Sequence, residues 1–105
     1  MNTIEHLSQM ESQLNQGLKS TQILQSALDD CEDSLPGLRQ LFAYYGSDAW
    51  YQHLELEKAG QIPPHQPRGV LSEDGVYNLI LECREIAEQL RQLADQLDSA
   101  IDQEE

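Results

Sequence analysis

Apolar residues recur at alternating spacings of three and four through the first part of the chain. The two sets of core positions in this heptad pattern are Leu7, Leu14, Thr21, Leu28, Leu35 and Phe42, and Met10, Gly17, Leu24, Cys31, Leu38 and Tyr45. Such spacing, sustained over about five heptads, is typical of a long helix packed in a coiled coil or a helical bundle. We therefore predict a helix over about residues 3–46, with Thr3 as its N-cap and Gly46 as the residue that ends it.

Pro36, followed by Gly37, lies inside this predicted helix. A proline there removes one backbone hydrogen bond, and its ring clashes with the carbonyl four residues earlier, at Glu32. The apolar pattern from Leu28 to Phe42 nevertheless keeps its phase across the proline. This continuity favours a kink, or a very tight break and restart, over two independent helices.

A short helix over about residues 47–59 is predicted next. Ser47 is a good N-cap, Asp48 suits the first turn of a helix, and Gly60 suits the position just past its end. The following residues, 60–71, include Pro63, Pro64 and Pro67. Prolines at this density predict an extended, stiff connector without helix.

The last predicted helix covers about residues 72–102. Ser72 is placed as its N-cap, with Glu73 and Asp74 in the first turn. Its core positions again alternate at spacings of three and four: Val76, Leu79, Cys83, Ile86, Leu90, Leu93, Leu97 and Ala100. Four further residues widen this stripe along one side: Ile80, Ala87, Ala94 and Ile101. A stripe this wide usually contacts more than one neighbour.

These elements predict a single all-α domain over residues 1–105. Two long antiparallel helices form a coiled-coil-like hairpin, and the short helix and the proline-rich connector join them. Because a two-helix hairpin leaves half of such broad stripes exposed, we expect a homodimer that completes a four-helix bundle. The alternative is a monomer in which the short helix and the connector cover the exposed side.

The formal charge of −13 at pH 7 excludes some partners. Nucleic-acid phosphates and anionic membranes repel such a chain, so we expect neither as a direct partner. The N-terminus lacks the features of a signal peptide, and no long apolar run is present, which predicts a cytoplasmic protein. Cys31 and Cys83 both lie on apolar stripes, so we interpret them as small buried thiols.

Catalytic signatures are not evident in the sequence. It has no glycine-rich phosphate loop, nucleophile elbow or HExxH motif, so we expect neither an enzyme nor a bound cofactor. The best metal candidates are His53 and Glu57, one helical turn apart, but two ligands do not make a site. Adjacent carboxylates such as Asp29 and Asp30 diverge on a helix, so we interpret them as solvated surface.

Two unusual stretches locate a candidate binding corner. YYGSDAW, residues 44–50, gathers two tyrosines and the only tryptophan, and Arg68 stands in the connector close to the predicted start of the last helix. The residues of this corner are Tyr44, Tyr45, Asp48, Trp50, Arg68, Glu73, Asp74 and Tyr77. Arg68 has the geometry to pair with Asp48, Glu73 or Asp74, either for a ligand site or to pin the connector to the helix end.

Three stretches together resemble a bacterial domain-of-unknown-function family, family 4298. They are YYGSDAW at 44–50, EKAGQIP at 57–63 and RGVLSEDGVYNLI at 68–80, with Gly75 where the family pattern has alanine. The resemblance implies that the middle segment forms one compact unit. It assigns no catalytic role to any residue.

Three functional hypotheses follow from these features. The first is a small acidic interaction or structural module, most simply a homodimer, with a further protein partner possible. The alternatives are a small ligand-binding protein or enzyme with its site at the corner, and an acidic mimic of nucleic acid that occupies a basic groove on another protein.

Overall fold

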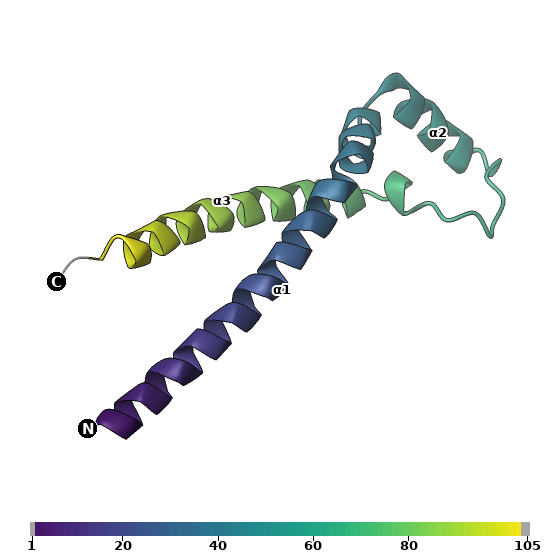
Figure 1. Cartoon of the computed structure of the whole chain (residues 1–105). Helices are drawn as coiled ribbons and strands as arrows, with labels where there is room; N and C mark the ends of the chain where they lie inside the picture. The colour runs from purple at the N-terminus through teal and green to yellow at the C-terminus, as the bar shows by residue number, and fades with distance from the viewer. Residues whose placement is uncertain (1, 104–105) are drawn as a thin grey trace. The chain divides into compact units, whose positions relative to one another are not determined.

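The computed structural model describes residues 2–103, and these residues are helical or irregular, without a strand. The elements are helix α1 (Thr3–Tyr44), helix α2 (Asp48–Lys58), the 3-10 helix η1 (Gly69–Leu71) and helix α3 (Gly75–Ile101). Figure 1 shows them along the chain, with the irregular connector between α2 and η1. The predicted all-α fold, with two long helices separated by a short helix and a connector, is confirmed.

The chain divides into two compact units, Met1–Arg39 and Gln40–Glu105. Helix α1 crosses this division, so that residues 40–44 belong to the second unit together with α2, η1 and α3. The first unit is therefore a single helix, and the tertiary packing described below lies in the second.

Helix α1 differs from the prediction at its start and at its proline. Asn2, and not Thr3, caps the helix: its Oδ1 accepts a hydrogen bond from the Glu5 backbone N–H at 2.8 Å. Thr3 is the first helical residue. Pro36 lies within the continuous helix, so the alternative of a break at this proline is wrong.

The seam positions of α1 in the first unit are largely exposed. Leu7 and Leu14 are 62% and 54% exposed, while Leu24, Leu28 and Leu38 are half-buried. Cys31 is exposed as well, so the prediction of a buried thiol at this position is wrong. The physical reason is simple: one helix cannot bury its own apolar stripe, and burial requires a second surface.

The short helix α2 has glycines at both flanks. Gly46, with φ of +80°, and Gly60, with φ of +72°, adopt the left-handed conformation that side chains disfavour. Ser47 is the N-cap, and its Oγ accepts a hydrogen bond from the Trp50 backbone N–H at 3.3 Å. The chain therefore reverses from α1 into α2 within three residues, 45–47.

The predicted start of the last helix at Ser72 is wrong by three residues. Helix α3 begins at Gly75, with Asp74 at the N-cap position, and ends at Ile101. Ser72 instead bridges two turns: its Oγ donates to the Gly69 carbonyl at 2.6 Å and accepts from the Gly75 N–H at 3.1 Å. The connector also contains the 3-10 turn η1 and is not extended throughout.

The core of the described residues is small and consists of Leu71 and Val76, which are 8% and 4% exposed. Both lie where η1 meets the first turn of α3. Leu79, Ile80, Cys83, Ala87 and Leu93 are half-buried. The burial predicted for Cys83 is thus only partial.

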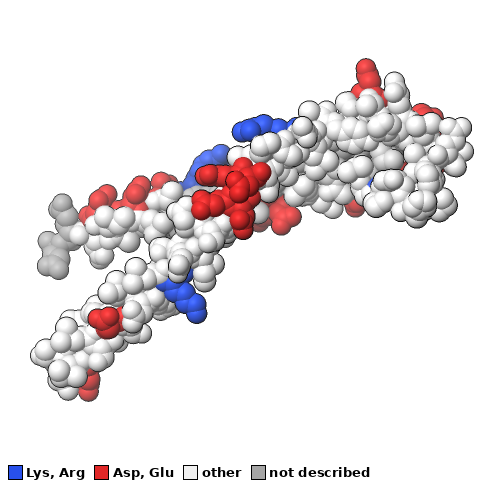
Figure 2. All heavy atoms as spheres, turned by 45° about the vertical axis from the view of Figure 1, so that its right-hand side comes forward, with Lys and Arg blue, Asp and Glu red and all other residues white. Residues whose placement is uncertain are grey.

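Acidic side chains dominate the charged surface. On the face shown in Figure 2, carboxylates are spread along the chain and Lys and Arg side chains are few, as the 19 acidic and 6 basic residues require. Among the described residues, no helix combines the length and the apolar character that are needed to cross a membrane.

Candidate functional site

The aromatic residues of YYGSDAW join α2 to the end of α1 and to η1. The rings of Tyr45 and Trp50 meet edge to face, with centroids 5.0 Å apart and planes at 68°. Tyr51 packs against the other side of Trp50, also at 5.0 Å. The Trp50 Nε1–H donates to the Val70 carbonyl at 2.9 Å. One side chain thereby ties α2 to a turn twenty residues later in the chain.

A second contact across the same corner joins Tyr44 and His53. The Tyr44 hydroxyl and His53 Nδ1 form a hydrogen bond of 2.7 Å, and their rings lie 5.6 Å apart. Tyr44 is the last residue of α1, and His53 lies in the second turn of α2. The polar tip of each side chain is therefore used to hold the two helices together.

Arg68 organises the connector. Its Nη2 donates to the Pro63 carbonyl at 2.8 Å, its Nε donates to the Gln66 carbonyl at 3.4 Å, and its Nη1 lies 3.7 Å from Glu57 Oε2. The expected partners Asp48, Glu73 and Asp74 are not the ones it uses, so that pairing was wrong. Because its contacts are with α2 and with the connector itself, Arg68 pins the connector in place.

The two weak metal candidates, His53 and Glu57, each contact a different residue. His53 is hydrogen-bonded to Tyr44, and Glu57 pairs with Arg68. Within residues 2–103, His, Cys, Asp and Glu form no group of three or more that is close enough to hold a metal ion. The pair therefore contributes to the helix corner.

The remaining residues of the predicted corner do not converge with Arg68. Asp48 is exposed in the first turn of α2, Glu73 and Asp74 are exposed before α3, and Tyr77 is 51% exposed on α3. The corner thus brings together the aromatic residues of 44–51 and, separately, the Arg68 contacts. It presents no convergent set of free polar groups like that of a small-molecule site.

The contacts of Arg68 lead to a graded prediction. We expect Arg68→Met to destabilise the chain by about 1–2 kcal/mol, because it removes a charge-assisted bond to a carbonyl that fixes the connector. Glu57→Gln removes only a partly exposed ion pair and should cost about 0.5 kcal/mol or less. Urea denaturation followed by helix circular dichroism measures both. Equal losses for the two variants would show that the ion pair, and not the Pro63 carbonyl bond, holds the connector.

Gly75 is required by the tight turn before α3. A Cβ placed there would lie 2.6 Å from Ser72 Oγ and 2.9 Å from the Gly69 carbonyl oxygen, which is closer than atoms pack. We expect Gly75→Ala to cost about 1–2 kcal/mol, because the Ser72 hydrogen bonds must break, although alanine favours a helix. The matched control is Gly17→Ala in α1, where a Cβ meets nothing within 4 Å, and it should stabilise the chain. Thermal unfolding that moves both variants upward would contradict this role.

An apolar groove lies beside the first turns of α3. Its volume is about 420 Å³, and it is lined by Leu41, Pro67, Gly69, Val70, Gly75, Val76 and Leu79. A second groove of about 430 Å³ lies next along the helix, lined by Phe42, Ile80, Cys83, Arg84 and Ala87. Both are open and almost entirely hydrophobic, which is the character of a surface that receives apolar side chains.

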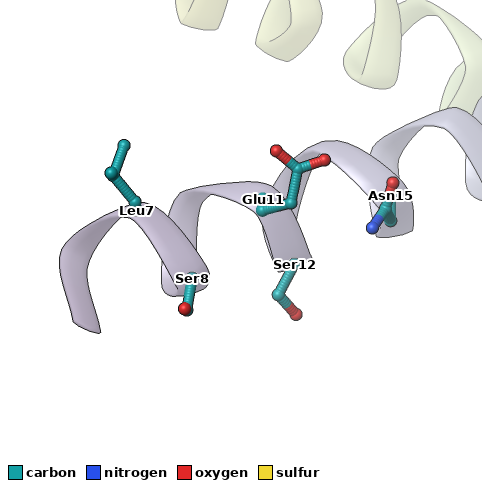
Figure 3. Close-up of a pocket in the computed structure, with 5 residues that line it drawn as sticks. All are labelled: Leu7, Ser8, Glu11, Ser12 and Asn15. Atoms are coloured by element: carbon teal, nitrogen blue, oxygen red, sulfur yellow. The ribbon is translucent and has the colours of Figure 1, made fainter. Parts of the chain in front are cut away.

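The depression on α1 is of a different kind. Its lining residues, Leu7, Ser8, Glu11, Ser12 and Asn15, come from one helix. Figure 3 shows that Leu7 and Glu11 point to one side of the helix while Ser8 and Ser12 point to the other. Side chains that diverge in this way do not enclose a ligand.

Sequence reasoning missed the backbone partners of this corner. The Val70 carbonyl accepts from Trp50, and the Pro63 carbonyl accepts from Arg68. Every residue has a carbonyl, so residue type carries no signal for such partners. The sequence suggested Glu57 only as a metal ligand. In the structure, it forms an ion pair with Arg68 instead.

Comparison with known proteins identifies a family for this chain. The family model described as "Domain of unknown function (DUF4298)" matches residues 7–93, which confirms the resemblance seen in the three sequence stretches. No curated protein and no solved structure matches the chain.

Proposed function

The chain belongs to the DUF4298 family, and we propose that it is a helical protein-interaction module that self-associates through the apolar stripe of α3. The observation that carries this proposal is the exposure of that stripe. Ile86, Leu90, Leu97 and Ile101 are 45%, 39%, 45% and 78% exposed on one side of the helix, with the half-buried Leu93 between Leu90 and Leu97. Covering each half-exposed Leu or Ile contributes on the order of 1 kcal/mol.

The distribution of charge along α3 supports a second copy as the partner. Charged residues of 75–101 lie mainly on the side away from the stripe: Arg84, Glu85, Glu88, Arg91, Asp95 and Asp98. At the core positions and the positions that flank them, Glu82 is the only charged residue. A basic partner helix needs several acids beside the stripe, and Glu82 is a single one. A neutral stripe instead suits a chain that meets its own copy despite a charge of −13.

The corner supports this function because its contacts hold the neighbouring elements in a fixed arrangement. Three of its polar side chains have partners within the chain: Tyr44 with His53, Trp50 with Val70, and Arg68 with the connector. These contacts hold the start of α3 and its grooves in one arrangement. That favours an interaction surface over a catalytic site.

Hydrogen–deuterium exchange at two protein concentrations tests the proposal and locates the surface. At about 100 µM we expect amides of residues 84–101 to exchange more slowly than at about 1 µM, because association protects a helix that is exposed in the single chain. Amides of α2 serve as the internal control and should not change. Equal exchange of residues 84–101 at both concentrations would contradict self-association through α3.

A further inference from the structure

We propose that two copies pair through α3 in antiparallel orientation, with Leu97 of each copy seated in the apolar groove beside Val76 and Leu79 of the other. This inference rests on the self-association proposed above and specifies its geometry. Each groove is then completed by a residue of the second copy.

The spacing of the α3 core positions permits this pairing along the whole helix. The positions follow each other at intervals of three, four, three, four, three, four and three, which reads the same in both directions. In antiparallel orientation about Glu88, the core positions from 79 to 97 therefore meet core positions of the second copy, while Val76 stays in the core of its own copy. The pairings, each of which occurs twice, are Leu79 with Leu97, Cys83 with Leu93, and Ile86 with Leu90.

The two ends of α3 differ in the way this pairing requires. At the N-terminal end, Val76 is 4% exposed, and a groove of about 420 Å³ lies open beside it. At the C-terminal end, Leu97 is 45% exposed. Antiparallel pairing places the exposed Leu97 of one copy beside the groove at the N-terminal end of α3 in the other copy.

The second groove fits the same register. Its lining residues on α3 are Ile80, Cys83, Arg84 and Ala87, and Phe42 of α1 also lines it. In the antiparallel pair, Leu93 and Ala94 of the second copy lie opposite this stretch. A parallel pair has no such match. It places the N-terminal ends of the two α3 helices, where the grooves lie, next to each other, so neither groove receives a side chain from the second copy.

Residues that flank the core positions on the apolar side of α3 also pack against each other in the antiparallel pair. About Glu88, Ala87 lies close to Ala87 of the second copy, and Ile80 lies close to Ala94 of the second copy. Small residues near the two-fold axis allow the helices to approach closely, and a large residue meets a small one on either side. Arg91 stays outside this contact, whereas Arg84 lines the second groove and borders the contact.

Spin-label distances between copies test the orientation directly. Labels are attached at Ser99→Cys or at Gln92→Cys, two exposed positions on the same outer side of α3, in a chain that also carries Cys31→Ser and Cys83→Ala. At about 1.5 Å rise per residue, antiparallel pairing about residue 88 separates two Ser99 labels along the axis by about 33 Å and two Gln92 labels by about 12 Å. Because the sideways separation of the labels adds to both axial components, we expect the Ser99 distance to exceed the Gln92 distance by about 10–20 Å.

Sedimentation of the same labelled proteins separates the possible failures. A dimer in which the two distances are equal shows a parallel pair and overturns the antiparallel register, while the proposed self-association stands. A dimer with any other pair of distances also overturns this register. A monomer at all concentrations overturns the proposed function itself.

Discussion

We expect Leu90→Asp to weaken the proposed self-association of the chain by at least about a hundredfold. Leu90 lies at a core position of α3 and, in the proposed pair, opposite Ile86 of the second copy next to the two-fold axis. A hundredfold change corresponds to about 2.7 kcal/mol, and a carboxylate carried into an apolar contact costs at least that much. In the single chain Leu90 is 39% exposed, so the substitution leaves the fold of the monomer intact. Sedimentation velocity over a concentration series measures the dissociation constant.

Gln92→Asp is the matched control for this experiment. It adds the same charge to the same helix two residues away, at an exposed position outside the stripe. We expect the dissociation constant to change by less than about threefold, because the added charge stays in water. If both variants weaken association equally, net charge and not the α3 stripe controls it, and the proposed surface is wrong.

We expect Trp50→Ala to destabilise the second unit by about 3 kcal/mol. The change removes the ring contacts with Tyr45 and Tyr51 together with the bond to the Val70 carbonyl, and truncation of a Trp side chain typically costs 3–5 kcal/mol when it is buried. Trp50 is only half-buried, which places the expectation at the lower end. Urea denaturation followed by circular dichroism, at one fixed low protein concentration, measures the loss.

Two further variants separate the parts of this contact. Trp50→Phe keeps a ring but loses the Nε1–H donor, and should cost about 1 kcal/mol. Tyr51→Ala removes a side chain that is 58% exposed and should cost less than about 1 kcal/mol. A Trp50→Ala variant no less stable than Tyr51→Ala would show that the corner does not hold α2 in place.

Much of the fold was predictable because the helices and their ends depend on residues that lie close together in the sequence. Heptad spacing from Leu7 to Tyr45 and from Val76 to Ala100 predicts two long helices, and the structure has α1 and α3 there. Ser47 and Gly60, as N-cap and terminating glycine, likewise predict the ends of α2. Such signals act within a few residues, which is why the chain alone reveals them.

The start of α3 shows where local reasoning fails. Ser72-Glu73-Asp74 has the composition of a helix N-terminus, yet Ser72 Oγ donates to the Gly69 carbonyl and the helix begins three residues later. The competing structure is the 3-10 turn η1, which packs Leu71 into the small core beside Val76. Burial of one leucine therefore outweighs cap preference, and burial depends on contacts that the local sequence does not record.

The candidate site was predicted in part for a similar reason. Tyr45 and Trp50 were placed together in the predicted corner, and their rings do meet. Arg68 was expected to pair with acids close to it in sequence, but it binds the Pro63 carbonyl and Glu57. The path of a proline-rich connector decides which groups an arginine reaches, and prolines fix local backbone angles without fixing that path.

Sedimentation equilibrium of the unmodified chain at low and high salt tests the central claim most directly. The proposal predicts a molar mass that rises with concentration toward twice the chain's 11.9 kDa. Association should be tighter at about 0.5 M salt than at about 0.05 M, because salt screens the repulsion between two chains of charge −13 while the apolar contact persists. A mass of 11.9 kDa at every concentration and both salt levels would contradict self-association.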